Sequence, residues 1–112
     1  MTAMQQPWEM RPDAVVWVDE RHAIVARAAT DGAISTVEVR RVGRPETRYL
    51  AQVVHEIGNR EHVMIIGPSV LKLALEREYV ALSHRPERLV PAPQGASAAG
   101  SEILHRMERL AA

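Results

Sequence analysis

The chain has 112 residues, no cysteine, and 14 basic against 14 acidic side chains, so its formal net charge is zero. This length supports one domain with a single core, and the lack of cysteine excludes disulfides, thiolate zinc sites and cysteine nucleophiles. The neutral balance argues against a nucleic-acid binder that relies on bulk charge, although a local basic patch can still bind.

The first 13 residues are polar and contain two prolines, so we expect a flexible N-terminal arm. This arm has no apolar run of the kind found in signal peptides. Elsewhere, no apolar stretch approaches the roughly 20 residues needed to span a bilayer. We therefore expect no membrane partner and a cytoplasmic location.

Three alternating runs of apolar and polar residues follow the arm, a pattern typical of half-buried β-strands. They cover residues 14–19, 22–29 and 34–40. The polar stretch at residues 19–22 suits a tight turn, and Thr30-Asp31-Gly32 is a second turn signal. The sequence therefore predicts a three-stranded antiparallel meander.

A helix is predicted after the third strand. Pro45 suits a first helical position, and Glu46 favours the positive end of the helix dipole. Gly58-Asn59 is a typical helix end. The apolar residues between follow the i, i+3, i+4, i+7 rule and form one buried stripe of Leu50, Val53, Val54 and Ile57.

Residues 62–67 form a continuous apolar run, which is typical of a strand covered on both faces. We expect it to be central and parallel to the first strand. Ser69 is a good N-cap for a second helix over about residues 70–83, and Arg85-Pro86 ends it. The apolar side of this helix should contain Leu71, Leu75, Tyr79 and Leu82, widened by Leu73 and Val80.

The C-terminal part divides into three pieces. Leu89-Val90 is a candidate edge strand, and residues 91–100 read as a flexible linker. Residues 101–112 form an amphipathic helix, too short to be stable alone, so it must dock on its own core or on a partner. Its apolar face consists of Ile103, Leu104, Met107 and Leu110.

The predicted order is β-β-β-α-β-α, within residues 14–90, and this is the ribonuclease H-like arrangement of an α/β domain. Two-metal phosphodiester cleavage on this fold needs several carboxylates that converge on the cations. Asp19 and Glu56 are candidates, but the central strand ends in Gly67 and Pro68 where another acid is needed. We therefore prefer a hairpin corner for Asp19 and keep a residual metal-dependent nuclease as the weakest alternative.

Other catalytic patterns are missing from the sequence. The five histidines show no paired ligand spacing, and there is no G-x-S-x-G serine motif. We therefore expect no catalytic residue, no metal site and no cofactor, and we favour a protein that is not an enzyme.

The turn between the central strand and the second helix is a candidate anion site. Helix N-termini present free backbone N–H groups, and Gly67 would allow a phosphate to approach. Lys72, the only lysine in the chain, lies where a cation opposes the helix dipole. We predict that Gly67, Ser69 and Lys72 bind an anion or RNA phosphate; the alternative is that Lys72 simply points into water.

Arginines gather at two further places. Arg44 and Arg48 lie at the junction of the third strand and first helix, and Arg85 lies where the second helix ends. All three are candidates for contacts with RNA phosphates. The alternative is a solvated surface in which Glu38, Glu46 and Glu87 pair with the arginines.

Four segments together resemble a compact bacterial family, sometimes called translational machinery proteins. This family is related to the central domain of archaeal and eukaryotic peptide-chain release factors and of Pelota. The resemblance covers about residues 14–90, and its most specific pieces are the V-W-V-D strand and the G-P-x-x-x-K turn. The segments are VVWVDERHAIVARA, YLAQVVHEIGN, HVMIIGPSVLKLALEREY and HRPERLV.

The resemblance implies a ribonuclease H-like fold and an association with the ribosome or RNA. Release factors carry a Gly-Gly-Gln loop, which this sequence lacks; the corresponding short loop is residues 41–45, and Gln94-Gly95 is no match. Peptide-release activity is therefore not expected. The leading hypothesis is a non-enzymatic, translation-associated module that contacts ribosomal RNA or a ribosomal protein, and the alternative is a homo-oligomer that assembles through residues 101–112.

Overall fold

The computed structural model describes residues 12–31 and 33–92. Residues 1–11, Gly32 and residues 93–112 lie outside the described part of the chain. The predictions that concern them are those for most of the N-terminal arm, the second turn, most of the linker and the C-terminal helix. The described elements, in chain order, are the strands and helices β1 (Ala14–Val18), β2 (His22–Ala28), β3 (Ile34–Arg40), α1 (Glu46–Ile57), β4 (Val63–Ile66), α2 (Ser69–Ser83), the 3₁₀ turn η2 (Pro86–Arg88) and β5 (Leu89–Val90).

The strands form one mixed sheet in the order β3-β2-β1-β4-β5. β1, β2 and β3 pair antiparallel as a meander, and β4 pairs parallel with both β1 and β5. The predicted meander, the interior strand parallel to the first, and the short edge strand are all confirmed. This topology confirms the ribonuclease H-like α/β prediction.

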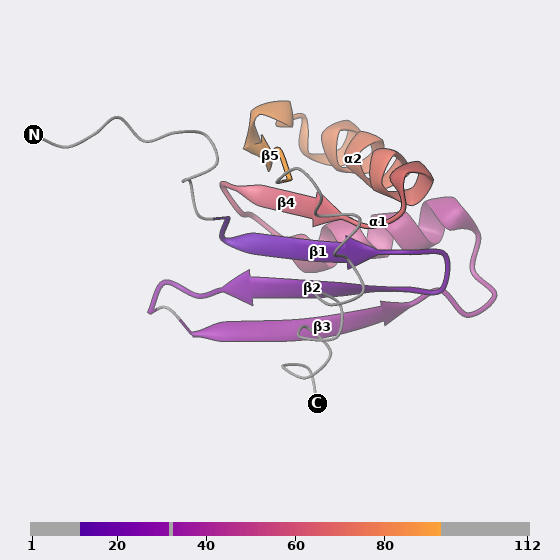
Figure 1. Ribbon diagram of the computed structural model, residues 1–112, viewed down its shortest axis with the longest axis horizontal. Coiled ribbons are helices and arrows are strands. Elements are labelled where there is room, and N and C mark those ends of the chain that lie inside the picture. Colours follow the sequence, from indigo (N-terminus) through magenta and orange to yellow (C-terminus); the bar gives the residue numbers. More distant parts are fainter. Residues whose placement is uncertain (1–11, 32, 93–112) are drawn as a thin grey trace, which may run out of the picture.

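Both helices cover the same face of the sheet (Figure 1). The main core lies between these two layers, because alternate residues of each strand point toward the helices. Val16 and Val25, opposite each other in the β1–β2 register, face this core and are fully buried. The helices contribute Tyr49, Leu50, Val53, Ile57, Leu71, Leu75 and Tyr79.

A second, smaller apolar cluster lies on the other face of the sheet. Its buried members are Trp17, Ile24 and Ile66 from three adjacent strands. Trp17 therefore lies on the face opposite the main core, whereas its neighbours Val16 and Val18 are part of the main core.

Asp19 closes the β1–β2 hairpin. Its Oδ1 accepts hydrogen bonds from the backbone amides of Arg21 (2.8 Å) and His22 (3.0 Å), and its Oδ2 accepts one from the Trp17 indole (3.0 Å). The buried Tyr49 hydroxyl donates to the Asp19 carbonyl at 2.8 Å, which joins the corner to the first turn of α1. The structure thus agrees with the hairpin-corner interpretation.

Two details of α2 differ from prediction. Pro68 occupies the N-cap position and Ser69 is the first helical residue, so Ser69 is not the cap. Leu73 and Leu82 are half exposed, whereas Leu71, Leu75 and Tyr79 are buried in the main core. A smaller shift affects α1, which has Pro45 at its N-cap and begins at Glu46.

The end of the expected N-terminal arm is fixed to the sheet. The Asp13 carboxylate accepts hydrogen bonds from the backbone amides of Glu61 (3.0 Å) and His62 (2.9 Å), just before β4. Among the described residues, no helix combines the length and apolar character needed to cross a membrane.

Candidate nucleic-acid interface

Five of the six predicted binding residues lie at one end of the domain. β1, β3 and β4 run in the same direction, and each helix starts after one of these strands has ended. The N-termini of α1 and α2 therefore lie at the same end of the sheet (Figure 1). Arg85 follows the C-terminus of α2 and lies at the opposite end. The structure thus brings Arg44, Arg48, Gly67, Ser69 and Lys72 to one end and places Arg85 away from them.

The loop between β3 and α1, residues 41–45, is a compact turn. The Arg41 amide donates to the Arg21 carbonyl (2.9 Å), and the Arg44 amide donates back to the Arg41 carbonyl (2.9 Å). Val42 and Gly43 have φ angles of 25° and 72°. A β-branched residue rarely adopts a positive φ, so Val42 is strained there. Its side chain is also 80% exposed, which leaves an apolar tip between arginines.

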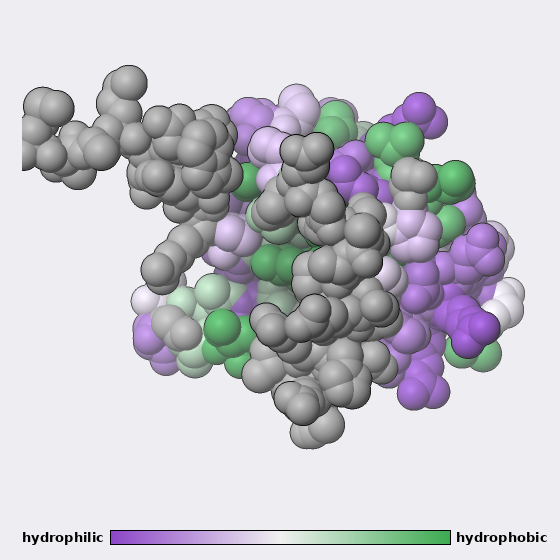
Figure 2. Space-filling view, in the orientation of Figure 1, coloured by the Kyte–Doolittle hydropathy of each residue, from purple (hydrophilic) through white to green (hydrophobic). Residues whose placement is uncertain are grey.

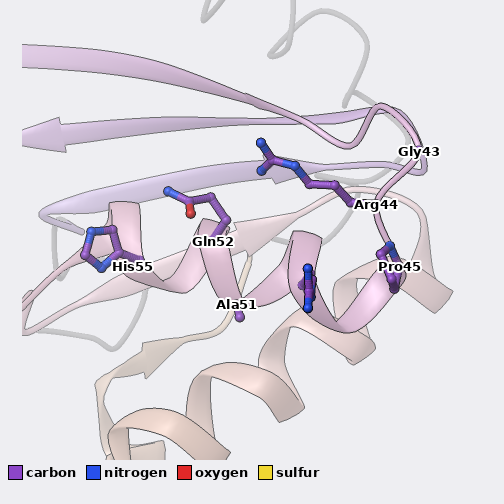
Figure 3. Close-up of a pocket in the computed structure, with 7 residues that line it drawn as sticks. Gly43, Arg44, Pro45, Ala51, Gln52 and His55 are labelled. Atoms are coloured by element: carbon purple, nitrogen blue, oxygen red, sulfur yellow. The ribbon is translucent and has the colours of Figure 1, made fainter.

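An open hollow of about 690 Å³ lies beside this loop (Figure 3). Arg44 extends from the loop toward Gln52 of α1, and His55 projects from the next turn of the helix. A neighbouring hollow of about 600 Å³ shares Arg44 and Gln52 with the first. The first hollow is lined by Gly43, Arg44, Pro45, Arg48, Ala51, Gln52 and His55.

Some of the arginines form ion pairs with carboxylates of the described residues, whereas others do not. Arg40 pairs with Glu38 at 3.1 Å, and Arg85 pairs with Glu87 at 3.7 Å, as the mixed-charge alternative predicted. Within residues 12–31 and 33–92, neither Arg44 nor Arg48 has a carboxylate within 4 Å, and both are exposed. These two cations are therefore available to an external anion without first breaking an ion pair.

The turn before α2 has a different character. Gly67 is buried with φ 141°, and a Cβ atom there would lie 2.1 Å from the Val18 carbonyl oxygen. The close approach of the chain to β1 therefore requires glycine, whether or not an anion binds. The Lys72 ammonium pairs with the Glu76 carboxylate at 3.7 Å, one turn along the helix. The phosphate site proposed at Gly67, Ser69 and Lys72 stays a prediction.

At the opposite end of the domain, Arg85 lies near a smaller hollow of about 390 Å³. Arg88 also lines this hollow, but its guanidinium donates to the Asn59 side-chain oxygen at 2.6 Å. The Tyr79 hydroxyl is buried at the same place without a hydrogen-bond partner within the described residues. Arg85 and Arg88 both interact with other side chains of the protein, Glu87 and Asn59. We therefore expect this hollow to bind an anion less well than the surface beside the β3–α1 loop.

The two carboxylates weighed for a nuclease lie far apart along the fold. Asp19 follows β1 and is joined to the start of α1, whereas Glu56 lies in the last turn of α1. The Glu56 side chain pairs with Arg27 at 3.6 Å and accepts a hydrogen bond from Gln52 at 3.0 Å. In the part of the chain that the structure describes, no three His, Cys, Asp or Glu side chains are grouped to hold a metal ion.

The environment of Asp19 also favours a structural role. Partial burial alone would raise the pKa of Asp19, but the hydrogen bonds from Trp17, His22 and Arg21 lower it below its ordinary value, aided by the His22 charge. Burial, together with the Asp19 charge, raises the pKa of the Tyr49 hydroxyl. Asp19 is therefore a stable anion that accepts hydrogen bonds, and Tyr49 remains a protonated donor.

Sequence reasoning missed Gln52 and His55 as lining residues. Both lie on the solvent side of α1, at i+4 and i+7 from Arg48, so one helix face carries all three. The helical spacing from Arg48 was a usable signal. The position of Arg44 over Gln52 depends on the turn geometry at Val42 and Gly43, which the sequence pattern did not indicate.

The comparisons with known proteins include an informative match among solved structures. No family model matches this sequence, and none of the curated proteins does. Among solved structures, the crystal structure of Archaeoglobus fulgidus Pelota matches with a TM-score of 0.56 and 15% sequence identity. The match covers 90% of this chain and 33% of the Pelota chain, so this chain spans about a third of that protein's length. At this identity the likeness concerns the fold, and the chain is similar to Pelota in its fold.

Proposed function

We propose that this protein is a translation-associated module without enzymatic activity, and that it contacts ribosomal RNA through the surface beside the β3–α1 loop. The observation that carries the proposal is the pair of exposed arginines, Arg44 and Arg48, without ion-pair partners in the described residues. The Pelota-like fold supports the connection to translation. Work at the ribosome would place the protein in the cytoplasm.

The chemistry of this surface suits a phosphate backbone. A guanidinium donates two parallel hydrogen bonds to a phosphate and is weakly hydrated, so arginine binds such groups well. Gln52 and His55 line the same hollow and can add hydrogen bonds to sugar or base atoms. The exposed Val42 side chain supplies an apolar contact at the tip of the loop. A ribosomal protein with an acidic surface is the second partner that this chemistry allows.

The proposal does not include peptide release. The sequence lacks Gly-Gly-Gln, and the loop at residues 41–45 is held close to the domain by backbone hydrogen bonds at both ends. A loop closed in this way cannot extend a catalytic tip far from the domain. Arg44 and Arg48 would instead position the domain on RNA.

The turn at Gly67, Ser69 and Lys72 lies at the same end of the domain, so it can form a second contact with the same RNA. Its contribution should be smaller, because Lys72 must leave Glu76 before it binds a phosphate. Arg85, at the opposite end, should not contribute to the same contact.

Co-sedimentation with ribosomes at low and high salt tests the proposal. The double variant Arg44→Gln/Arg48→Gln should bind more weakly than the unchanged protein at low salt. Arg85→Gln is the matched control, because it removes a cation from the other end of the domain, and it should bind normally. If the unchanged protein stays at the top of the gradient at both salt concentrations, the proposal is wrong.

A further inference from the structure

The face of the sheet that the helices leave open is apolar. Trp17, Ile24 and Ile66 form its buried centre, and Val15, Ala26, Met64 and Ala92 pack around them. Figure 2 looks onto this face and shows apolar surface over the middle of the sheet. A sheet with an apolar stripe on both faces is normally covered on both faces by other parts of a protein. The continuous apolar run of β4 likewise predicted a strand that is covered on both faces.

The burial of this cluster distinguishes it from the other apolar surface of the domain. Ile24 and Ile66 are each only 1% exposed, although α1 and α2 lie on the opposite face. In contrast, Val70 is 73% exposed and Leu73 is 50% exposed on the outer side of α2. A strand's neighbours in the sheet shield its side chains laterally but not from above, so burial this complete needs atoms over the face.

The path of the chain indicates where this cover comes from. The last described residue, Ala92, packs against the Trp17–Ile24–Ile66 cluster, so the chain leaves the described part on this face. The remaining 20 residues contain one apolar pattern, the amphipathic segment 101–112. Residues 93–100 can span up to about 28 Å, whereas β2 lies only about 10 Å across the sheet from β4.

We propose that residues 101–112 form a helix that lies on the open face of its own sheet, over Trp17, Ile24 and Ile66. A helix of 12 residues is about 18 Å long, close to the length of a five-residue strand such as β1. Its apolar side would face the cluster, and His105 and Arg109 would point to solvent. The fold would then be a helix–sheet–helix sandwich whose third layer is the C-terminal segment.

Trp17 fluorescence tests the proposal, with Trp8→Phe as the background so that Trp17 is the only tryptophan. Met107→Asp places a charge at the centre of the apolar side of the segment. His105→Asp is the matched control, because it introduces the same charge on the opposite side of the same helix. We expect Met107→Asp, and truncation after Gly95, to shift Trp17 emission to longer wavelength and to increase its quenching by acrylamide. His105→Asp should leave both unchanged.

Two results would overturn the proposal. If Met107→Asp leaves Trp17 emission and quenching unchanged, the segment does not cover this face. Light scattering gives the second result: a dimer that becomes a monomer on truncation after Gly95 would mean that a second copy, not the same chain, receives the segment. A monomer in both forms, with Trp17 exposed by Met107→Asp, supports the intramolecular position. Circular dichroism confirms that each variant remains folded, and Met107→Asp decides the question if the truncated chain does not fold.

Discussion

The turns before α1 and α2 lie at the same end of the domain, and each contains a glycine that is followed along the chain by a basic residue. The surroundings of these residues differ between the two turns. Before α2, Gly67 is buried against β1 and Lys72 pairs with Glu76. Before α1, a Cβ atom added at Gly43 would meet open space, and Arg44 has no ion pair among the described residues. The first turn is committed to the fold, whereas the second presents its groups to the outside. A glycine and a cation at a helix N-terminus therefore do not by themselves indicate a binding site.

The largest expected effect separates the two glycines. Gly67→Ala should destabilise the protein by about 3–5 kcal/mol, because the new methyl group meets the Val18 carbonyl and the backbone conformation disfavours alanine. Gly43→Ala should cost only about 1 kcal/mol, since its space is open and only the positive φ opposes it. Urea denaturation of both variants measures the difference, and equal losses would contradict the comparison.

Tyr49→Phe tests how the β3–α1 region is fixed to the hairpin. The variant removes the 2.8 Å hydrogen bond to the Asp19 carbonyl without changing the packing of the ring. We expect a loss of about 1 kcal/mol in the free energy of unfolding. The ribosome binding of this variant should be unchanged, because Tyr49 does not line the hollow beside Arg44. A loss of binding with intact stability would mean that the hydroxyl has a functional role.

The pH dependence of Asp19 tests whether the corner is a structural anion. Its pKa in the folded protein is lowered below the ordinary 3.8, so its charge adds stability above that pH, and this contribution is lost as the pH falls through the folded pKa. Asp19→Asn lacks this contribution and places a side-chain NH₂ or oxygen where the carboxylate accepts from Trp17. The stability difference between the two proteins should therefore be constant near neutral pH and shrink below about pH 4. A difference that stays constant to about pH 2 would contradict the assignment.

The smallest effects concern Lys72 and Arg48. Lys72→Gln should change stability by at most a few tenths of a kcal/mol, because the partly exposed i, i+4 ion pair that it removes contributes about 0.3–0.5 kcal/mol, while the lysine cation opposes the helix dipole. Arg48→Gln should change stability even less, since Arg48 has no ion pair with a described carboxylate. Thermal unfolding of the two variants at low salt shows whether the ranking holds. A larger loss for Arg48→Gln would mean that this arginine stabilises the fold.

The sheet and helices were predictable because each has a strong period in the sequence. The alternation in residues 14–40 and the continuous run in β4 indicated the strand order and the parallel pair. The apolar face of α2 was overestimated: Leu71, Leu75 and Tyr79 are buried in the main core, whereas Leu73 and Leu82 stay half exposed. Composition cannot show which apolar residues a neighbouring layer reaches.

The candidate site was harder to predict, because it depends on pairing in three dimensions. Lys72 stood out as the only lysine, yet the sequence did not reveal that Glu76 would pair with it. Arg44 and Arg40 have similar neighbours along the chain, but only Arg40 has a carboxylate on its own strand face, at Glu38. Arg44 follows the Val42-Gly43 turn and extends toward Gln52 of α1.

The salt dependence of ribosome binding tests the central claim most directly. The slope of log affinity against log salt concentration should become shallower by about 1.4–1.8 in Arg44→Gln/Arg48→Gln, since each lost phosphate contact removes about 0.7–0.9. Lys72→Gln should change the slope by much less than the double variant. The opposite ranking, in which Lys72→Gln flattens the slope and the arginine variant leaves it unchanged, would contradict the account and move the RNA contact to the turn before α2.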